Sequence, residues 1–228
     1  MSPSQTQTIK RPHVESAVPT EDIRIAVLDG EAEREALFRF RHDVYVREMR
    51  RPQAHADHTH GRIEDPLDAT GINLVAWQGE RIVGCVRANL ARDGGLEFHD
   101  ALYDMAAHSP DYPHGVGIVT RLMLARELRG SEFTTRLFLR LYRLSLQQGV
   151  QHAYMDCNAH LQPLFLRFGF VAHIPVREHP EYGLVQPMRL DLHDHAHLAR
   201  VASPYLPELQ AFRQTTQVSA GHPAKLGQ

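Results

Sequence analysis

The chain has 228 residues, 43% of them hydrophobic and 23% charged, so it is long enough to bury one sizeable core and fits one domain with extensions. Its 25 Lys and Arg residues against 27 Asp and Glu residues give a formal net charge of -2, which argues against a nucleic-acid-binding protein. No apolar stretch is long enough to cross a bilayer, and residues 1–19 lack the apolar core of a signal peptide, so we expect a cytoplasmic protein without an integral membrane segment. Cys85 and Cys157 fall within apolar runs and are expected to be buried, reduced thiols.

The first half of the chain predicts an antiparallel arrangement. Alternating Ile23, Ile25 and Val27 are typical of a half-buried strand, and the two runs joined at Gly79 and Glu80 are typical of a hairpin. In chain order we expect a flexible tail at 1–20, a strand at 23–27, a helix at 31–49, a long loop at 50–71 and hairpin strands at 72–78 and 81–90.

The second half alternates helices with strands. Ser131 is expected to cap a helix that Gly149 ends. The remaining elements predicted are a helix at 96–108, strands at 116–124 and 150–157, a helix at 160–168, closing strands at 170–176 and 183–192, and a C-terminal extension at 193–228, partly helical to 213 and then disordered. This order predicts an α/β domain over 21–192, with a mixed sheet and helices on both faces.

Residues 116–170 resemble the cofactor half of a GNAT (Gcn5-related N-acetyltransferase) acyltransferase. The segment has a strand, the turn Arg129-Gly130, a helix, a second strand and the sequence LFLRFGF at 164–170. The resemblance implies a GNAT fold of about seven strands whose two central strands, 116–124 and 150–157, splay apart. It also implies that the pantetheine arm of an acyl thioester lies in the gap between them.

A second set of fragments resembles two branches of that superfamily, the acyl-homoserine lactone (autoinducer) synthases and the long-chain N-acyl amino acid synthases of the FeeM type. The first-helix sequence FRFRHDVYV at 38–46 carries this likeness. Three further fragments agree in order and spacing: EDPLD at 64–68, GCVR at 84–87 and TRL at 120–122. Together the fragments extend the resemblance over residues 21–192.

The resemblance implies a polar cluster at the acceptor end of the cleft. It makes Arg121, Thr120, Asp65 and Asp68 candidates for catalysis, and Arg41, Tyr45, Arg87 and Ile118 candidates for substrate binding. Elementary physics favours such a cluster independently, because an Arg in an apolar strand requires a carboxylate partner from the loop or from a substrate. The structural alternative is an ion-pair network that only holds the loop against the sheet.

The donor end is implied by the same resemblance. Backbone amides of the first splayed strand would hold the thioester carbonyl, and the helix that follows Ser131 would offer free N–H groups to a phosphate. The residues expected to contact the donor are Leu122, Leu124, Arg129, Gly130, Ser131, Asn158 and Phe165.

Three departures from the family patterns bear on the substrates. Glu132 replaces a small residue in the phosphate turn, which favours a carrier protein with one phosphate over coenzyme A with its pyrophosphate. Phe165 replaces the Tyr that protonates the leaving thiolate in many acetyltransferases, as the carrier-protein branch allows. Ile118 stands where autoinducer synthases carry a Glu, which counts against lactone synthesis. The general base stays open among Asp65, Asp68 and a water molecule.

These observations predict an N-acyltransferase that moves a medium or long acyl chain from an acyl carrier protein, or from acyl-CoA, to the α-amine of an amino acid. The partners expected are the carrier protein and a small amine, with acyl-phosphopantetheine or acyl-CoA as cosubstrate, no tightly bound cofactor and no nucleic acid. The alternatives are a lactone synthase that uses S-adenosylmethionine and a non-catalytic module that binds acyl thioesters. The His-rich segments at 55–60 and 193–197 are expected to be solvated loops without a metal.

Overall fold

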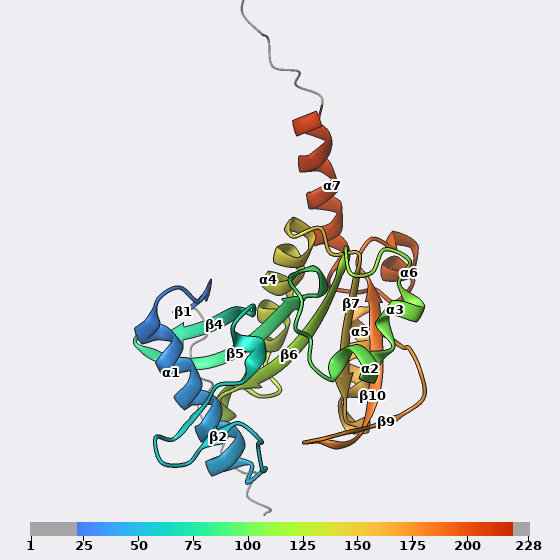
Figure 1. Ribbon diagram of the computed structural model, residues 1–228. Coiled ribbons are helices and arrows are strands. Elements are labelled where there is room, and N and C mark those ends of the chain that lie inside the picture. The colour runs from blue at the N-terminus through green and yellow to red at the C-terminus, as the bar shows by residue number, and fades with distance from the viewer. Residues whose placement is uncertain (1–21, 221–228) are drawn as a thin grey trace, which may run out of the picture.

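A mixed sheet lies at the centre of the protein, and the computed structural model describes residues 22–220 (Figure 1). The predicted tail at 1–20 and the end of the chain beyond 220 lie outside these residues. The strand order is β1-β4-β5-β6-β7-β10-β8, and β9 pairs with β10. The strands are β1 (Ile23–Val27), β4 (Ile72–Gln78), β5 (Arg81–Leu90), β6 (Val116–Leu124), β7 (His152–Cys157), β8 (Val171–Ala172), β9 (Arg177–His179) and β10 (Gly183–Asp191).

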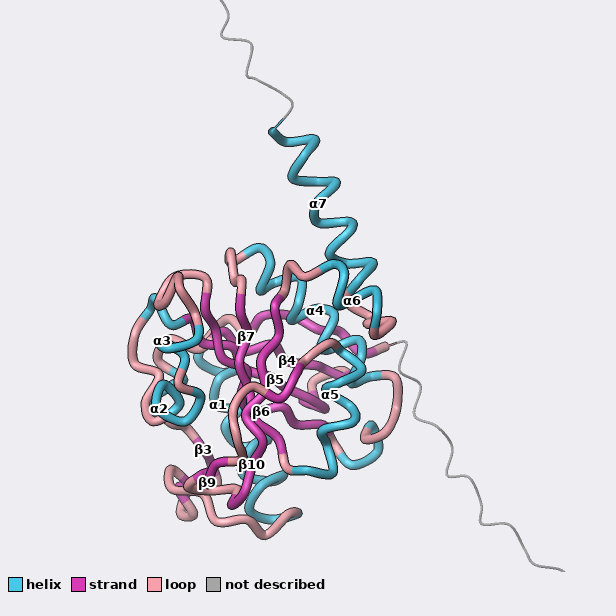
Figure 2. Tube along the Cα trace, turned by 90° about the vertical axis from the view of Figure 1, so that its right-hand side faces the viewer, coloured by secondary structure: helices cyan, strands magenta, loops and turns pink. Residues whose placement is uncertain are grey.

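Helices cover both faces of this sheet, as predicted (Figure 2). One face of the sheet is covered by α1, α2 and α3, and the other face is covered by α4, α5, α6 and α7. The helices are α1 (Glu31–His42), α2 (His99–Tyr103), α3 (Met105–His108), α4 (Phe133–Gln147), α5 (Gln162–Phe168), α6 (His195–Arg200) and α7 (Leu206–Ala220). Tyr205 and Leu209 of the C-terminal extension are buried in the same core as α4, and Tyr205 stacks on Tyr142 with ring centroids 4.1 Å apart.

The helix predicted at 31–49 changes form after His42. A π-helix, Asp43–Glu48, follows α1, and the Met49 amide donates to the Val44 carbonyl across five residues. The long loop contains a two-stranded ribbon, β2 (Ala56–Asp57) with β3 (Arg62–Ile63), and a 3₁₀ turn. Short π-helical segments are frequently found at functional sites, and this one immediately precedes the loop that borders the cavity described below.

The two central strands part, as predicted. β6 and β7 are paired in parallel at Val116 with His152, Gly117 with Ala153 and Ile118 with Tyr154, and no later pair joins them within residues 22–220. On its other edge, β6 bulges: two residues, Arg121 and Leu122, lie opposite the single residue between Cys85 and Arg87 on β5. The bulge coincides with a left-handed backbone at its first residue, Arg121, whose φ is 55°.

Buried ion pairs hold the loop before β4 against the sheet. Arg41 Nη1 lies 2.7 Å from Asp68 Oδ2, Arg41 Nη2 donates to Asn73 Oδ1 at 2.7 Å, and Arg87 Nη1 lies 2.9 Å from Asp68 Oδ1. Asp68 also caps the 3₁₀ turn Pro66–Asp68 by accepting from the Asp65 amide. Burial raises the pKa of Asp68, but the guanidinium groups of Arg41 and Arg87 together lower it by more than burial raises it. The pKa of Asp68 therefore lies below its usual value.

We expect Asp68→Asn to lower the free energy of unfolding by about 3–5 kcal/mol at neutral pH, because it leaves the fully buried Arg41 without its counter-charge. Denaturant unfolding measures the loss. A carboxyl with a lowered pKa contributes stability above its unfolded value, near 3.8, and loses it as the pH falls, so the difference from the wild type should shrink in acid.

Asp43→Asn is the matched control, since Asp43 forms an exposed pair with Arg47 one helical turn away. Its loss of stability should be several-fold smaller. Equal losses for the two variants would contradict a structural role for the buried pair.

Candidate active site

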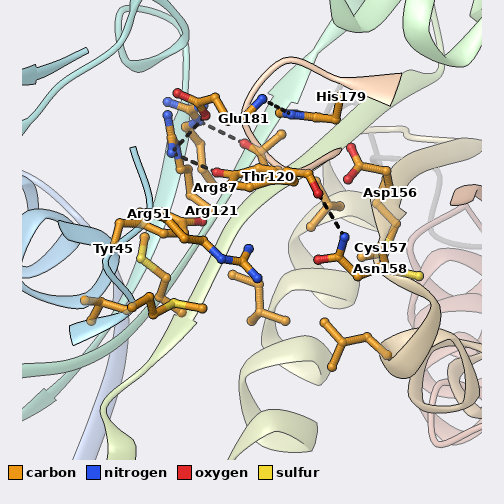
Figure 3. Close-up of a pocket in the computed structure, with 18 of the residues that line it drawn as sticks. Tyr45, Arg51, Arg87, Thr120, Arg121, Asp156, Cys157, Asn158, His179 and Glu181 are labelled. Atoms are coloured by element: carbon orange, nitrogen blue, oxygen red, sulfur yellow. Dashed lines mark hydrogen bonds and ion pairs between the residues drawn. The ribbon is translucent and has the colours of Figure 1, made fainter. Parts of the chain in front are cut away.

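A cavity of about 610 Å³ opens where β6 and β7 part (Figure 3). Residues 119–124 of β6 form one wall, and residues 155–158 at the end of β7 form the other. Its volume falls in the range of sites that enclose small molecules, about 300–1,000 Å³. The cavity therefore occupies the gap in which the pantetheine arm is expected to lie.

A carboxylate held between two guanidinium groups forms one end of the cavity. Arg87 Nη1 donates to Asp65 Oδ1 at 2.6 Å, and Arg121 donates to Asp65 Oδ2 from Nη2 at 2.6 Å and from Nε at 3.0 Å. Arg87 Nε also donates to the Thr120 hydroxyl at 3.1 Å. Burial raises the pKa of Asp65, but the charges of Arg87 and Arg121 outweigh it and hold the pKa well below its usual range. Asp65 is therefore ionised and fully hydrogen-bonded, and such a carboxylate is a weak base.

The opposite side of Arg121 is occupied as well. Its Nη1 donates to Gln53 and, at 3.1 Å, to the hydroxyl of Tyr182, and its guanidinium carbon lies 5.4 Å from the ring centre of Tyr45. Arg121 has φ of 55°, a left-handed conformation that is strained for a residue with a side chain. The bulge and these partners together fix the guanidinium, so its donors are already used before a substrate enters.

The other end of the cavity lies near the start of α4 and along α5. Gly130, with φ of 74°, forms the turn before α4, and Arg129 pairs with Glu48 while its Nε donates to the Leu124 carbonyl at 3.0 Å. The hydroxyl of Ser131 accepts from the Phe133 amide at 3.2 Å. The N-cap of α4 is nevertheless Glu132 rather than the predicted Ser131, which lies one residue earlier in the turn. Apolar side chains surround this end: Leu122, Leu124, Met155, Leu161, Leu164 and Phe165.

The structure brings most of the predicted site residues together around the cavity. Its wall includes Tyr45, Asp65, Arg87, Thr120, Arg121, Leu122, Leu124, Arg129, Gly130, Asn158 and Phe165. Four predicted residues are not part of that wall. Arg41 and Asp68 lie buried behind Asp65, and Ile118 belongs to the same buried cluster as Leu67 and Tyr154. The hydroxyl of Ser131 bonds the Leu128 carbonyl and the Phe133 amide in the turn before α4.

Several polar residues of the wall were not foreseen, and two enclosed ones, Arg51 and Asp156, have no ion-pair partner within residues 22–220. Arg51 lies 5.7 Å from the ring centre of Tyr182 and forms no ion pair within residues 22–220. Asp156, near the end of β7, accepts a hydrogen bond from the Tyr103 hydroxyl at 2.6 Å and pairs with no Arg or Lys in the same described range. His179 and Glu181 also line the wall. Asp156 carried a signal, a carboxylate inside an apolar strand, whereas Arg51 lies in a charged stretch without any pattern.

Burial shifts the pKa of two histidines and one cysteine of the wall. It lowers the pKa of His99 to about 4 and also lowers that of His179, so both rings are neutral at pH 7. It raises the pKa of the Cys157 thiol to about 11, which leaves too little thiolate for a nucleophile. Cys85 and Cys157 are free and buried, as predicted.

Within residues 22–220, no group of three or more His, Cys, Asp or Glu side chains is placed to hold a metal ion. No helix in the described range is long and apolar enough to cross a membrane.

Comparisons with known structures identify the fold. The chain is similar to FeeM, an N-acyl amino acid synthase from uncultured soil microbes, with a TM-score of 0.61 and 14% identity over 82% of this chain and 97% of that chain. It is also similar to the CoA-dependent acyl-homoserine lactone synthase BjaI with MTA (TM-score 0.58, 22% identity, 75% and 82% covered) and to TofI in a ternary complex with an inhibitor and MTA (0.60, 14%, 81% and 98%). The predicted GNAT-type fold class is thus confirmed.

The sequence comparison with protein families is more specific. No curated protein matches the chain. The family described as N-acyl amino acid synthase FeeM matches residues 36–191, more than half of the chain and all of the parted sheet from β4 to β10. The chain therefore belongs to the FeeM family of N-acyl amino acid synthases, and it is an acyltransferase.

Proposed function

We propose that this acyltransferase moves a medium or long acyl chain from the thioester of an acyl carrier protein to the α-amine of an amino acid. The observation that carries the proposal is the gap between β6 and β7, apolar towards α5 and charged at Arg51, Asp65 and Arg121. A thioester with an apolar tail fits the first end, and an acceptor with charged groups fits the second.

The donor would be held mainly by backbone. Beyond Ile118, β6 no longer pairs with β7, so its inward N–H and C=O groups are free to bond the amides of a pantetheine arm. An N–H of this strand aimed at the thioester carbonyl would stabilise the oxyanion that forms when an amine attacks.

Charge near the phosphate turn favours a carrier protein over coenzyme A. Arg129 is already paired with Glu48, and Glu132 adds a second carboxylate beside the turn. One phosphate tolerates these carboxylates better than a pyrophosphate does, because it carries less negative charge to repel them.

The acceptor would be recognised through Arg51. Arg121 and Arg87 are bound to Asp65, and Arg129 is bound to Glu48, so Arg51 is the arginine of the described cavity wall without a carboxylate partner. Figure 3 shows its side chain extended into the cavity. An amino acid would supply the missing carboxylate while its α-amine faces the thioester.

The direct test incubates the purified protein with acyl carrier thioesters, or with acyl-CoA of the same chain lengths, and a mixture of amino acids. Mass spectrometry should detect N-acyl amino acids, with the carrier thioester as the better donor. Consumption of short acyl-CoA alone would contradict the carrier protein and the long chain. Lactone release with S-adenosylmethionine would identify a lactone synthase instead, and thioester binding without turnover against any amine would identify a binding module.

Arg51→Gln should raise KM for the amino acid roughly tenfold to hundredfold and leave kcat near the wild-type value. This loss of affinity corresponds to the free energy of one hydrogen bond between charged groups. For an acceptor amine that lacks the α-carboxylate but is otherwise identical, the KM of Arg51→Gln should equal that of the wild type. Steady-state kinetics with both acceptors measures the difference.

Arg47→Gln is the matched control, because Arg47 pairs with Asp43 on the surface and is not part of the cavity wall. It should behave like the wild type with both acceptors. An equal rise in KM for the amino acid and for the amine in Arg51→Gln would exclude carboxylate recognition.

A further inference from the structure

We infer that Asp156 is the general base that takes the proton from the attacking amine. The inference rests on the proposed function, because it assigns a catalytic residue to the same cavity. Its grounds are the position of Asp156 across the gap, the state of the competing carboxylates and the surroundings of its side chain.

The strand register places Asp156 opposite the acceptor end of β6. Ile118 and Tyr154 are the last paired residues, and side chains two positions further along each strand return to the same face of the sheet. Thr120 on β6 and Asp156 on β7 therefore face the same side of the sheet across the gap, and both line the cavity (Figure 3). A thioester lying between the strands at this level has Asp156 on one side and the Arg87–Thr120 pair on the other.

The other carboxylates of the described cavity wall are less suited to accept a proton. Asp65 uses both oxygens to bind two arginines. Glu181 accepts from the Ala54 amide at 2.9 Å and lies 3.8 Å from Arg121. Glu97 is exposed on the loop before α2. Asp156 is partly buried and bonded to a neutral hydroxyl.

His179 does not replace Asp156 in this role. Its Nδ1 lies 3.0 Å from the Glu181 amide, which can only donate, so Nδ1 accepts and the neutral ring carries its proton on Nε2. In that tautomer no nitrogen is left to take a proton from an amine. His179 can instead donate from Nε2 to an oxygen in the cavity.

The surroundings of Asp156 adjust its basicity in the direction that catalysis requires. Burial raises the pKa of Asp156 above 3.8, and the hydrogen bond from Tyr103 and the nearby His179 offset this rise only in part. The neighbouring Cys157 is a neutral thiol. A carboxylate whose pKa is raised by burial is a stronger base than an ordinary carboxylate, as a general base requires.

Asp156 accepts one proton during the transfer and releases it before the next turnover. The neutral amine attacks the thioester carbonyl and forms the C–N bond, which gives a tetrahedral intermediate with a positive nitrogen and a negative oxygen. Asp156 removes one N–H proton, the oxyanion collapses, and the C–S bond breaks with the electron pair leaving on sulfur. The proton on Asp156 then passes to the thiolate or to water, so the products are an amide and a free thiol.

Asp156→Asn should reduce kcat at pH 7 by about a hundredfold or more, within the range of general-base catalysis. The Asn side chain can still accept from Tyr103, so the cavity wall is kept. The residual rate should rise with pH, as a larger fraction of the acceptor amine is deprotonated in solution. Affinity for a non-reactive acyl-pantetheine analogue and thermal stability should match the wild type.

Tyr103→Phe tests the base assignment through the pH dependence of kcat, which a purely structural role of Asp156 would leave unchanged. The Tyr103 hydroxyl stabilises the ionised carboxylate, so its removal should raise the pKa of Asp156. Activity requires the ionised form, and the acidic limb of the kcat–pH profile should therefore move to higher pH, with the plateau largely retained. A uniform loss at every pH would overturn the assignment.

Asp100→Asn is the matched control, because Asp100 accepts from the Tyr112 hydroxyl at 2.6 Å, the same kind of bond, and is not part of the cavity wall. It should keep the wild-type rate and profile. Wild-type activity in Asp156→Asn would refute the base and leave the proposed function intact. Absence of any acyl transfer by the wild type would instead refute both.

Discussion

The backbone of β6 must find hydrogen-bond partners along an edge where β7 has moved away, and this constraint governs the rest of the structure. After three paired residues the pairing of the two strands ends, and β6 carries a bulge at Arg121 and Leu122 on its other edge. A strand edge inside a domain is costly unless something bonds it. An elongated ligand with its own amides can complete this edge, whereas a strand paired along it would close the site to a thioester.

Charges are divided between the structure and the site. Arg41, Arg87 and Arg121 are balanced by Asp65 and Asp68, which fix the loop, the bulge and one wall of the cavity. The structural alternative raised by the sequence therefore describes part of the cluster well. Arg51 and Asp156 form no ion pair in the described wall, and neither does the exposed Glu97. Arg51 and Asp156 are therefore the more enclosed groups left to act on a substrate.

Local patterns were sufficient for four strands of the main sheet but not for all of them: the strand expected at 170–176 is only β8, Val171–Ala172, and β2, β3 and β9 were not foreseen. The strands at 23–27, 72–78, 81–90 and 116–124 have the bounds that their alternation predicts, because side-chain periodicity depends on neighbours in sequence. The π-helix escaped the helical pattern, although the five-residue step from Val44 to Met49 is its signature. The sequence could not predict which charged side chains pair with one another, because these pairs depend on which strands lie side by side in the sheet.

The site was predicted in the same uneven way. Reasoning that an Arg in an apolar strand needs a partner led to Arg87 and Arg121, and the same reasoning applied to Asp156 would have identified it too. Arg51 is different, because its importance arises from the absence of a partner in space rather than from its neighbours in sequence.

A structure of the protein with a non-hydrolysable acyl-pantetheine thioether tests this account most directly. The account predicts that the arm lies between β6 and β7 and bonds the backbone of 119–124, with the sulfur level with Thr120 and Asp156 and the acyl chain among apolar side chains. A ligand bound outside this gap, or a sheet in which β6 and β7 pair along their full length, would contradict it.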